Sequence, residues 1–149
     1  MEQKLSTVSK RILSFVIDDI VIGIFLLIIF YDQITALGVE ASKYQNIEDI
    51  KLLVDSFVID ALPIVITLKV LYHALLVWQS GMTIGKYIVK IKVIDITTNQ
   101  TPSFAQATFR SLFRIVSELP FYLGFLLAFV TPKRQTLHDK VSNCVVVDV

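Results

Sequence analysis

Two adjacent carboxylates, Asp18 and Asp19, lie inside an apolar run that extends from Ile12 to Phe30. A run of about 20 residues is the length that an α-helix needs to cross a bilayer. A charged side chain at that depth costs roughly 2.5–3.5 kcal/mol on insertion scales, so we expect it to have a partner or a function. These two acids, with Arg11 at the start of the run, are the first candidates for a functional site.

The apolar residues are collected into long runs and do not alternate with polar ones. Hydrophobic residues make up 54% of the chain and charged residues 18%, with a net charge of +1. This pattern favours a membrane protein over one soluble domain. Basic residues are scattered and balanced by acids, which argues against nucleic-acid binding. Cys144 is the only cysteine, so we expect no internal disulfide and no thiolate metal site. We also expect no cofactor.

We expect an all-α membrane protein that forms a single domain over residues 1–149. Its first span is predicted at about 12–30 and its second at about 56–78. The first resembles a signal peptide in its basic start, but two acids interrupt it and Tyr31-Asp32-Gln33 offers no small-residue cleavage site. We therefore interpret it as a retained span.

A third apolar segment, at about 112–130, allows two topologies. It is interrupted by Glu118 and Pro120, so it either crosses the bilayer or bends and re-enters on the same side. We favour the re-entrant form, because the strand-like tail Cys144–Val149 needs a partner on its own side of the membrane. A simple three-span chain is the alternative.

Basic residues are divided unevenly between the loops. Residues 31–55 carry five acids and two lysines, whereas residues 79–114 carry five basic residues and one acid. By the positive-inside rule, the N-terminus and the second loop are cytoplasmic and the acidic loop is outside. The sequence thus predicts a multi-pass protein of the cell membrane, with the lipid bilayer as its first partner.

The second loop predicts a small cytoplasmic β element. Val89, Ile91 and Val93 alternate with lysines, the period of a half-buried strand. We expect a strand over Tyr87–Ile96 to pair with the tail Cys144–Val149, because a lone strand is not stable.

A helix is predicted between these two strands. Ser103 and Gln106 fit a capping box at its start, and it extends from Phe104 to about Ser117. Arg110 and Arg114 lie four residues apart on one stripe. We expect an interfacial helix with both arginines at the level of the lipid headgroups.

Three motifs, taken together, give the chain a resemblance to a known family. They are Arg11 with Asp18, Gly81-Met82-Thr83-Ile84-Gly85-Lys86, and Leu137-His138-Asp139-Lys140. With this set the chain resembles the RDD membrane proteins, named for one arginine and two aspartates, which here correspond to Arg11, Asp18 and Asp139. Ser142-Asn143-Cys144 departs from the small residue, glycine and threonine usual in the family. Transport, including cation–proton exchange, has been proposed for the family, so the resemblance implies that transport is a candidate function.

Helical geometry suggests which intramembrane charges meet. Arg11 and Asp18 share a face but lie about 10 Å apart along the axis, too far for a direct ion pair. Lys69 and His73 lie at the depth of Asp18, counted from the cytoplasmic end of the second span. We therefore expect a buried cluster of Asp18 with His73 and Lys69. Asp19 points about 100° away, toward another helix, a second protomer or a water-filled cavity.

The segment Gly81–Lys86 is not a nucleotide-binding loop. A P-loop requires glycine where Ser80 stands and serine or threonine where Tyr87 stands. We expect instead a tight turn that leads from the second span into the first strand. Lys86 would then meet a lipid phosphate or pair with Asp139.

The C-terminal motif does not predict catalysis. His138, Asp139 and Ser142 include the residue types of a hydrolase triad, but no nucleophile elbow or oxyanion site accompanies them. We expect Asp139 to cap the tail or to pair with Arg110 or Arg114. The sequence therefore does not predict an enzyme.

Two functions remain open. One is a small transporter that exchanges a monovalent cation for protons, with Asp18 or Asp19 as the binding carboxylate and His73 as the relay. A chain of 149 residues has few helices with which to enclose a path, so this function predicts a homo-oligomer. The other is a scaffold or accessory subunit whose buried charges fix how the spans pack. Its cytoplasmic face, Lys86–Ser117 with the tail, would dock a partner or anionic lipid.

Overall fold

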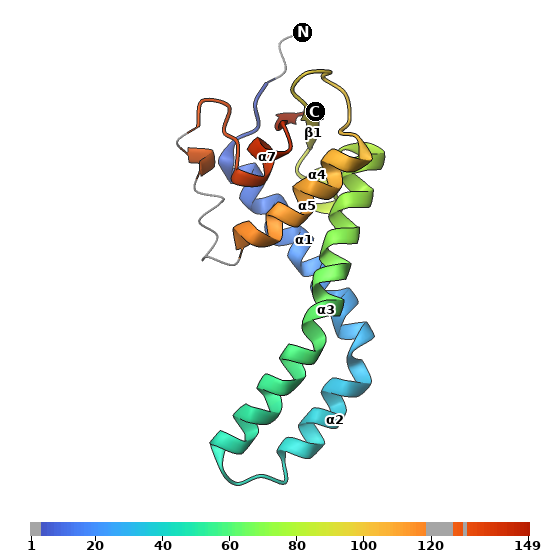
Figure 1. Ribbon diagram of the computed structural model, residues 1–149, viewed down its shortest axis with the longest axis vertical. Helices are drawn as coiled ribbons and strands as arrows, with labels where there is room; N and C mark the ends of the chain where they lie inside the picture. The colour runs from blue at the N-terminus through green and yellow to red at the C-terminus, as the bar shows by residue number, and fades with distance from the viewer. Residues whose placement is uncertain (1–3, 119–126, 130) are drawn as a thin grey trace.

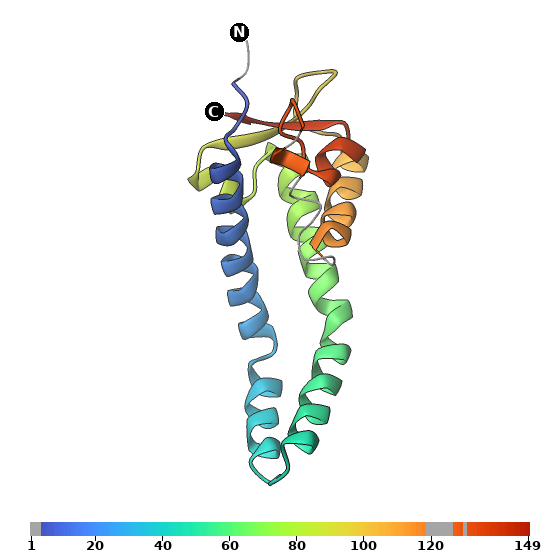
Figure 2. The same ribbon diagram turned by 90° about the vertical axis from the view of Figure 1, so that its left-hand side faces the viewer.

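The computed structural model describes residues 4–118, 127–129 and 131–149 of the chain. It is an elongated helical hairpin with a small layer of helices and strands across one end, which we call the cap (Figure 1). The C-terminus and the start of the first helix lie at the cap, and the connection between the second and third helices lies at the opposite end (Figure 2).

Three helices form the hairpin. α1 (Val8–Ile29) leads away from the cap, α2 (Tyr31–Ala41) extends it, and α3 (Ile47–Ser80) returns to the cap. α1 begins where the Thr7 hydroxyl accepts a hydrogen bond from the backbone N–H of Lys10. α3 has 34 residues and continues through Pro63, so it is longer than the predicted second span.

α1 agrees with the first predicted span. By length and composition it can cross a membrane, and it is the one helix of the described residues that meets this test. Only 17% of its most apolar stretch is buried, unlike the core helix of a soluble protein. The predicted number of spans, two full spans with a third segment, is not confirmed. The third segment, 112–130, includes residues 119–126 and 130, which lie outside the described part of the chain.

The cap contains the predicted pair of strands. β1 (Ile91–Asp95) and β2 (Cys144–Asp148) are antiparallel, with Ile91 opposite Asp148 and Asp95 opposite Cys144. Leu5 forms an isolated bridge with Val147 at the other edge of β2. The pairing of the second loop with the C-terminal tail is thus confirmed.

The first strand is shorter than the predicted Tyr87–Ile96. Its first two residues, Tyr87 and Ile88, instead end a short helix, α4 (Ile84–Ile88), which begins after the N-cap residue Thr83. Lys90 then has a φ of 56°, a left-handed conformation that redirects the chain. The strand therefore begins only at Ile91.

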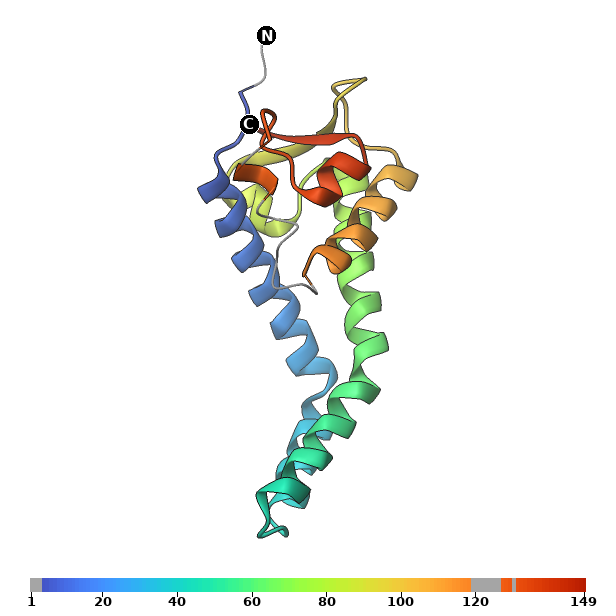
Figure 3. The same ribbon diagram turned by 60° about the vertical axis from the view of Figure 1, so that its left-hand side comes forward.

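Two further helices complete the cap. α5 (Phe104–Glu118) packs along α3, and α7 (Leu137–Val141) packs against α5 (Figure 3). The predicted capping box at the start of α5 is present. The N–H of Ser103 donates to Gln106 Oε1 at 2.9 Å, and the N–H of Gln106 donates to Ser103 Oγ at 3.3 Å.

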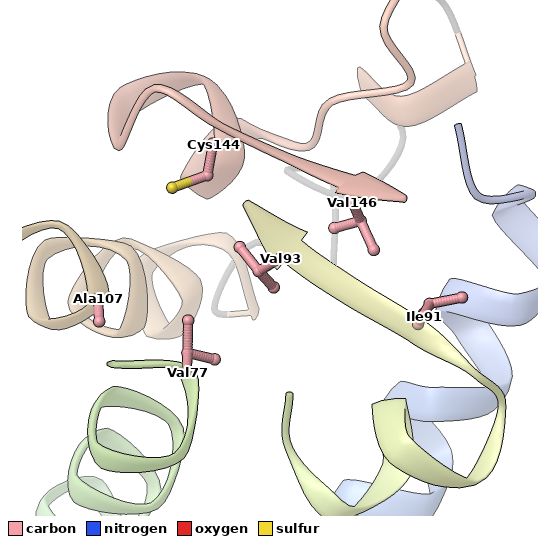
Figure 4. Packing of buried hydrophobic residues seen from close by; sticks show 6 residues of the cluster. All are labelled: Val77, Ile91, Val93, Ala107, Cys144 and Val146. Carbon is pink, nitrogen blue, oxygen red and sulfur yellow. The ribbon is translucent and has the colours of Figure 1, made fainter. Parts of the chain in front are cut away.

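The apolar core of the cap is small and joins these elements. It is formed by buried side chains from α3, β1, α5 and β2 (Figure 4): Val77, Ile91, Val93, Ala107, Cys144 and Val146. Along the hairpin, by contrast, many large apolar side chains are exposed, including Ile20, Ile24 and Leu27 of α1. Such a contiguous apolar surface is expected of a chain surrounded by lipid or by other protein.

Gly81 fixes the connection between α3 and the cap. Its φ is 74°, and its N–H donates to the carbonyl of Val77 at 2.9 Å, which ends α3. A Cβ atom there would lie 2.7 Å from the carbonyl oxygen of Val93 and 2.7 Å from Lys92 Cε. Glycine is therefore required both for the backbone conformation and for the close approach of β1.

Replacing this glycine should destabilise the cap. Gly81→Ala should lower the free energy of unfolding by about 1–3 kcal/mol, because alanine is strained in the left-handed region and its methyl group contacts β1. Gly38→Ala is the matched control, since a Cβ there meets nothing within 4 Å. Denaturant titration of the detergent-solubilised protein measures both. Equal stability of the two variants would contradict the assigned role of Gly81.

Candidate functional site

Asp18 lies at the junction of α1, α3 and α4 and has no exposed surface. Its Oδ1 accepts hydrogen bonds from Tyr72 Oη and from the N–H of Gly85, both at 2.8 Å. Its Oδ2 accepts one from Thr83 Oγ1 at 2.6 Å. Lys86 Nζ lies 3.7 Å from the same oxygen. The carboxylate is therefore held by two hydroxyls, one amide and one ammonium group.

The predicted cluster of Asp18 with His73 and Lys69 is wrong. The prediction compared only the depths of these groups along the two long helices, and it did not take account of α4. That helix folds back against α1 and presents its N-terminal groups to Asp18, because Thr83 is both the N-cap of α4 and a donor to the carboxylate.

Gly85 is what allows α4 to approach α1 so closely. A Cβ atom on Gly85 would lie 2.1 Å from the carbonyl oxygen of Ser14 and 3.0 Å from Asp18 Cγ. Any side chain would push the N-terminus of α4 away from the carboxylate. The two glycines of the segment Gly81–Lys86 thus serve different close contacts, one with β1 and one with α1.

Lys86 is buried beside Asp18. Its Nζ lies 3.3 Å from Thr83 Oγ1, and the residue is 6% exposed. Burial lowers the pKa of Lys86 to about 7, although the charge of Asp18 opposes that shift. The amine therefore changes its charge near neutral pH. The expectations that Lys86 meets a lipid phosphate or pairs with Asp139 are wrong, because its carboxylate partner is Asp18.

A second carboxylate, Asp139, joins two arginines. Arg110 donates to Asp139 Oδ1 from Nε at 2.9 Å and from Nη2 at 2.7 Å. Arg11 donates to Oδ2 from Nη1 at 2.9 Å. Thr136 Oγ1 also donates to Oδ2, at 2.8 Å, in the capping box that begins α7. The predicted pairing with Arg110 and the predicted cap are confirmed, whereas the direct contact with Arg11 was not expected.

These cations determine the charge state of Asp139. Burial alone would raise the pKa of the carboxyl group, but Arg110 foremost, with Arg11 and the Thr136 hydroxyl, holds that pKa far below its ordinary value. The neighbouring His138 has its pKa lowered by burial, so its ring is neutral. Its Nε2 lies 2.9 Å from Thr136 Oγ1.

Arg11 connects α1 to the rest of the cap. Besides its bond to Asp139, its Nε donates to Ser6 Oγ at 2.8 Å and its Nη2 to the carbonyl of Val146 at 3.3 Å. α1, α7 and β2 are therefore held by one guanidinium group. Sequence reasoning missed this role, because residues 11 and 139 are far apart in the chain.

The third charged group contains Lys69 and His73, the residues first assigned to Asp18. Lys69 Nζ lies 3.6 Å from Asp19 Oδ1, and Arg114 Nη2 lies 3.9 Å from the same oxygen. Arg114 Nη1 donates to His73 Nδ1 at 3.1 Å, and its guanidinium lies 4.7 Å from the ring centre of Phe15. Asp19 thus faces α3 and α5. This agrees with the expectation that it points toward another helix.

The arginines of α5 do not face outward, where lipid headgroups could contact them. Arg110 and Arg114 are each 4% exposed and face the other cap elements. The prediction assumed that an amphipathic helix turns its cations toward water. Here the cations turn inward instead, because Asp139 and Asp19 lie there to compensate them. Tyr72 and Thr136, which bond the two buried aspartates, carried no signal in the sequence.

Comparison with known proteins identifies the family of this chain. The sequence model of the RDD family matches residues 5–143, a range that contains Arg11, Asp18 and Asp139. The chain therefore belongs to the RDD family, whose members are membrane-associated, and it is a membrane protein of that family. No solved structure matches the chain.

Curated relatives share about half of this chain. A proline-rich antigen homolog of Mycobacterium tuberculosis (strain H37Rv) is 35% identical over 83 residues, which is 51% of this chain and 35% of the relative. A proline-rich antigen of Mycobacterium leprae is 37% identical over 79 residues, covering 48% and 32%. An uncharacterized protein of Rickettsia prowazekii is 26% identical over 70 residues, covering 47% and 38%. The matches thus span about a third of the relatives' own lengths.

Removing the charge of Asp139 should unfold the cap. Asp139→Asn leaves two buried arginines uncompensated and should lower the free energy of unfolding by about 3–5 kcal/mol. Asp148→Asn is the control, because its pair with Lys10 is partly exposed and should contribute no more than about 1 kcal/mol. Thermal and denaturant unfolding in detergent measure the difference.

Wild type and Asp139→Asn can also be compared as a function of pH. Because the pKa of Asp139 is lowered in the folded state, its contribution is complete above its ordinary pKa of about 4 and decreases as the pH falls below that value. The stability difference between wild type and Asp139→Asn should therefore shrink in acid. A difference that stays constant down to pH 3 would contradict the assigned charge state.

Proposed function

We propose that this membrane protein exchanges a monovalent cation for a proton at Asp18, with Lys86 as the group that competes for the carboxylate. The observation that carries the proposal is the geometry around Asp18. A fully buried carboxylate is shared between oxygen ligands and an amine that titrates near neutral pH. Buried groups with shifted pKa values are frequent at functional sites.

The oxygen atoms around Asp18 suit a hard monovalent cation. Thr83 Oγ1 and Tyr72 Oη lie 2.6 Å and 2.8 Å from the two carboxylate oxygens. Both hydroxyls have lone pairs that can turn toward a cation. Carboxylate and hydroxyl oxygens are the ligand type that alkali and alkaline-earth cations favour. A cation here would replace hydrogen bonds and the weak contact with Lys86.

Lys86 supplies the proton in this scheme. When Lys86 is charged, it compensates Asp18 from 3.7 Å. A cation bound at Asp18 repels the ammonium group and lowers its pKa further, so the amine releases its proton. One positive charge enters the site and one leaves it, and the buried site keeps the same net charge throughout the exchange.

Asp19 is the candidate for the next step of the path. It adjoins Asp18 in the chain and its side chain is 30% exposed, in contact with Lys69, which is 23% exposed. The exposed apolar surface of α1 is available for a second protomer, and a homo-oligomer would help to enclose this path. His73 remains a candidate relay through its contact with Arg114.

A scaffold function is the second candidate. The observation that favours it is that Asp18 and Asp139 are each completely buried and each accept several hydrogen bonds, as expected of groups that only fix packing. The two functions differ in the result of neutralising Asp18. A scaffold loses stability, whereas a transporter that remains folded loses flux.

Asp18→Asn should abolish exchange. In proteoliposomes with an imposed pH gradient, wild type should dissipate the gradient when sodium, lithium or potassium is added, and Asp18→Asn should not. The amide keeps an acceptor for Thr83 but has no charge with which to hold a cation. Asp55→Asn, which changes an exposed acid of α3, should behave as wild type.

The folded state of each variant decides between the two functions. Circular dichroism and size-exclusion chromatography should show that Asp18→Asn is folded. Absence of flux from folded, inserted wild type with every cation would reject exchange. An Asp18→Asn protein that is unfolded would instead support the scaffold.

The exchange should depend on pH through Lys86. Below its pKa of about 7 the lysine is charged and competes with the cation, so cations should bind more tightly as the pH rises. The half-saturating cation concentration should fall by up to about tenfold per pH unit between pH 6 and 7, and level off above. Lys86→Gln should remove this dependence. An identical pH profile in Lys86→Gln would contradict the role of Lys86.

A further inference from the structure

A small, partly open cavity lies in the cap, and the two hydroxyl groups that bond Asp18 are not part of its described lining. Its volume is about 30 Å³, room for about two water molecules. Its described lining residues come from α1, α4, α5, α7, β2 and the turn before α7: Arg11, Ser14, Phe15, Lys86, Arg110, Arg114, Thr136, His138, Asp139 and Val146.

The charges around this cavity are mostly positive. Among its described lining residues four are basic and one is acidic. All five of these charged side chains are less than a tenth exposed. Asp139 is bonded to both Arg11 and Arg110, so a single carboxylate compensates two guanidinium groups. Lys86 lies 3.7 Å from Asp18 and Arg114 lies 3.9 Å from Asp19. These four cations therefore face three carboxylates, and the remaining positive charge is unfavourable in a buried site unless a negative charge accompanies it.

We propose that this cavity binds one small inorganic anion of the size of chloride. Buried guanidinium and ammonium groups are the donors that bind anions most strongly. A volume of about 30 Å³ suits a halide better than the larger phosphate, carboxylate ligands or lipid headgroups. The bound charge offsets the surplus left by the shared Asp139. The site is distinct from the cation position at Asp18, and it does not require that the protein transports anything.

Lys86 couples the cavity to pH. The groups that face it come from four elements: Arg11 and Asp18 of α1, Tyr72 and His73 of α3, Arg110 and Arg114 of α5, and His138 and Asp139 of α7. The pKa of Lys86 is lowered to about 7, chiefly by burial. A neighbouring anion favours the charged form. Anion binding therefore takes up a proton and is tighter at pH 6 than at pH 8.

Halide titration of the purified full chain in detergent tests the proposal. Chloride or bromide replaces gluconate at constant ionic strength, and the unfolding midpoint and the ³⁵Cl line width are recorded. We expect a saturable rise of the midpoint, larger at pH 6 than at pH 8, and a broadened ³⁵Cl signal that bromide displaces. No saturable difference between chloride and gluconate at either pH would overturn the proposal and leave water as the occupant.

Two variants fill the cavity without changing its charge. Val146→Ile and Ser14→Thr each add one carbon to a lining residue and should weaken halide binding by tenfold or more. Val147→Ile is the matched control, since Val147 lies on β2 and packs in a different apolar cluster. Halide binding retained in both filled variants would place the anion elsewhere and overturn the assignment. The readout is equilibrium binding, so failure of cation exchange leaves this result unaffected.

Discussion

The carboxylate of Asp139 is the group on which the cap depends. It is bonded to Arg110 of α5, to Arg11 of α1 and to Thr136 at the start of α7, and Arg11 also donates to the backbone of β2. No local interaction could hold these elements together, because they are far apart in sequence and the apolar core is small. Removing one partner leaves the others charged and buried, so the elements must assemble as a unit.

Those features that depend on local pattern were predictable from the sequence. The pairing of β1 with β2 followed from the alternation of residues such as Ile91 and Val93, because an unpaired apolar strand has to find a mate. The capping box of α5 followed from the chemistry of Ser103 and Gln106. The family motif identified the three charged residues around which the cap is built, although it did not indicate that Arg11 contacts Asp139.

The partners of the buried charges were not predictable, for a physical reason. Depth along straight helices treats each span as a rod, whereas Asp18 is satisfied by a turn that folds back from the end of α3. That turn depends on Gly81 and Gly85, whose missing side chains admit β1 and α1. Arg114 was likewise expected at the level of the lipid headgroups. Amphipathic spacing shows which residues share a face, and it does not show whether that face meets solvent or other buried charges.

Lys86 stands between the two proposed ion sites, and they act on it in opposite directions. A cation at Asp18 repels the ammonium group and favours release of its proton, whereas an anion in the cavity attracts it and favours retention. Binding of the two ions is therefore coupled through the proton of Lys86. The cation favours loss of this proton and the anion favours its retention, so each ion opposes the effect of the other on the charge of the lysine. An anion in the cavity would shift cation exchange to higher pH without touching Asp18. The buried surplus of positive charge is then a means of setting the pH at which the site exchanges ions.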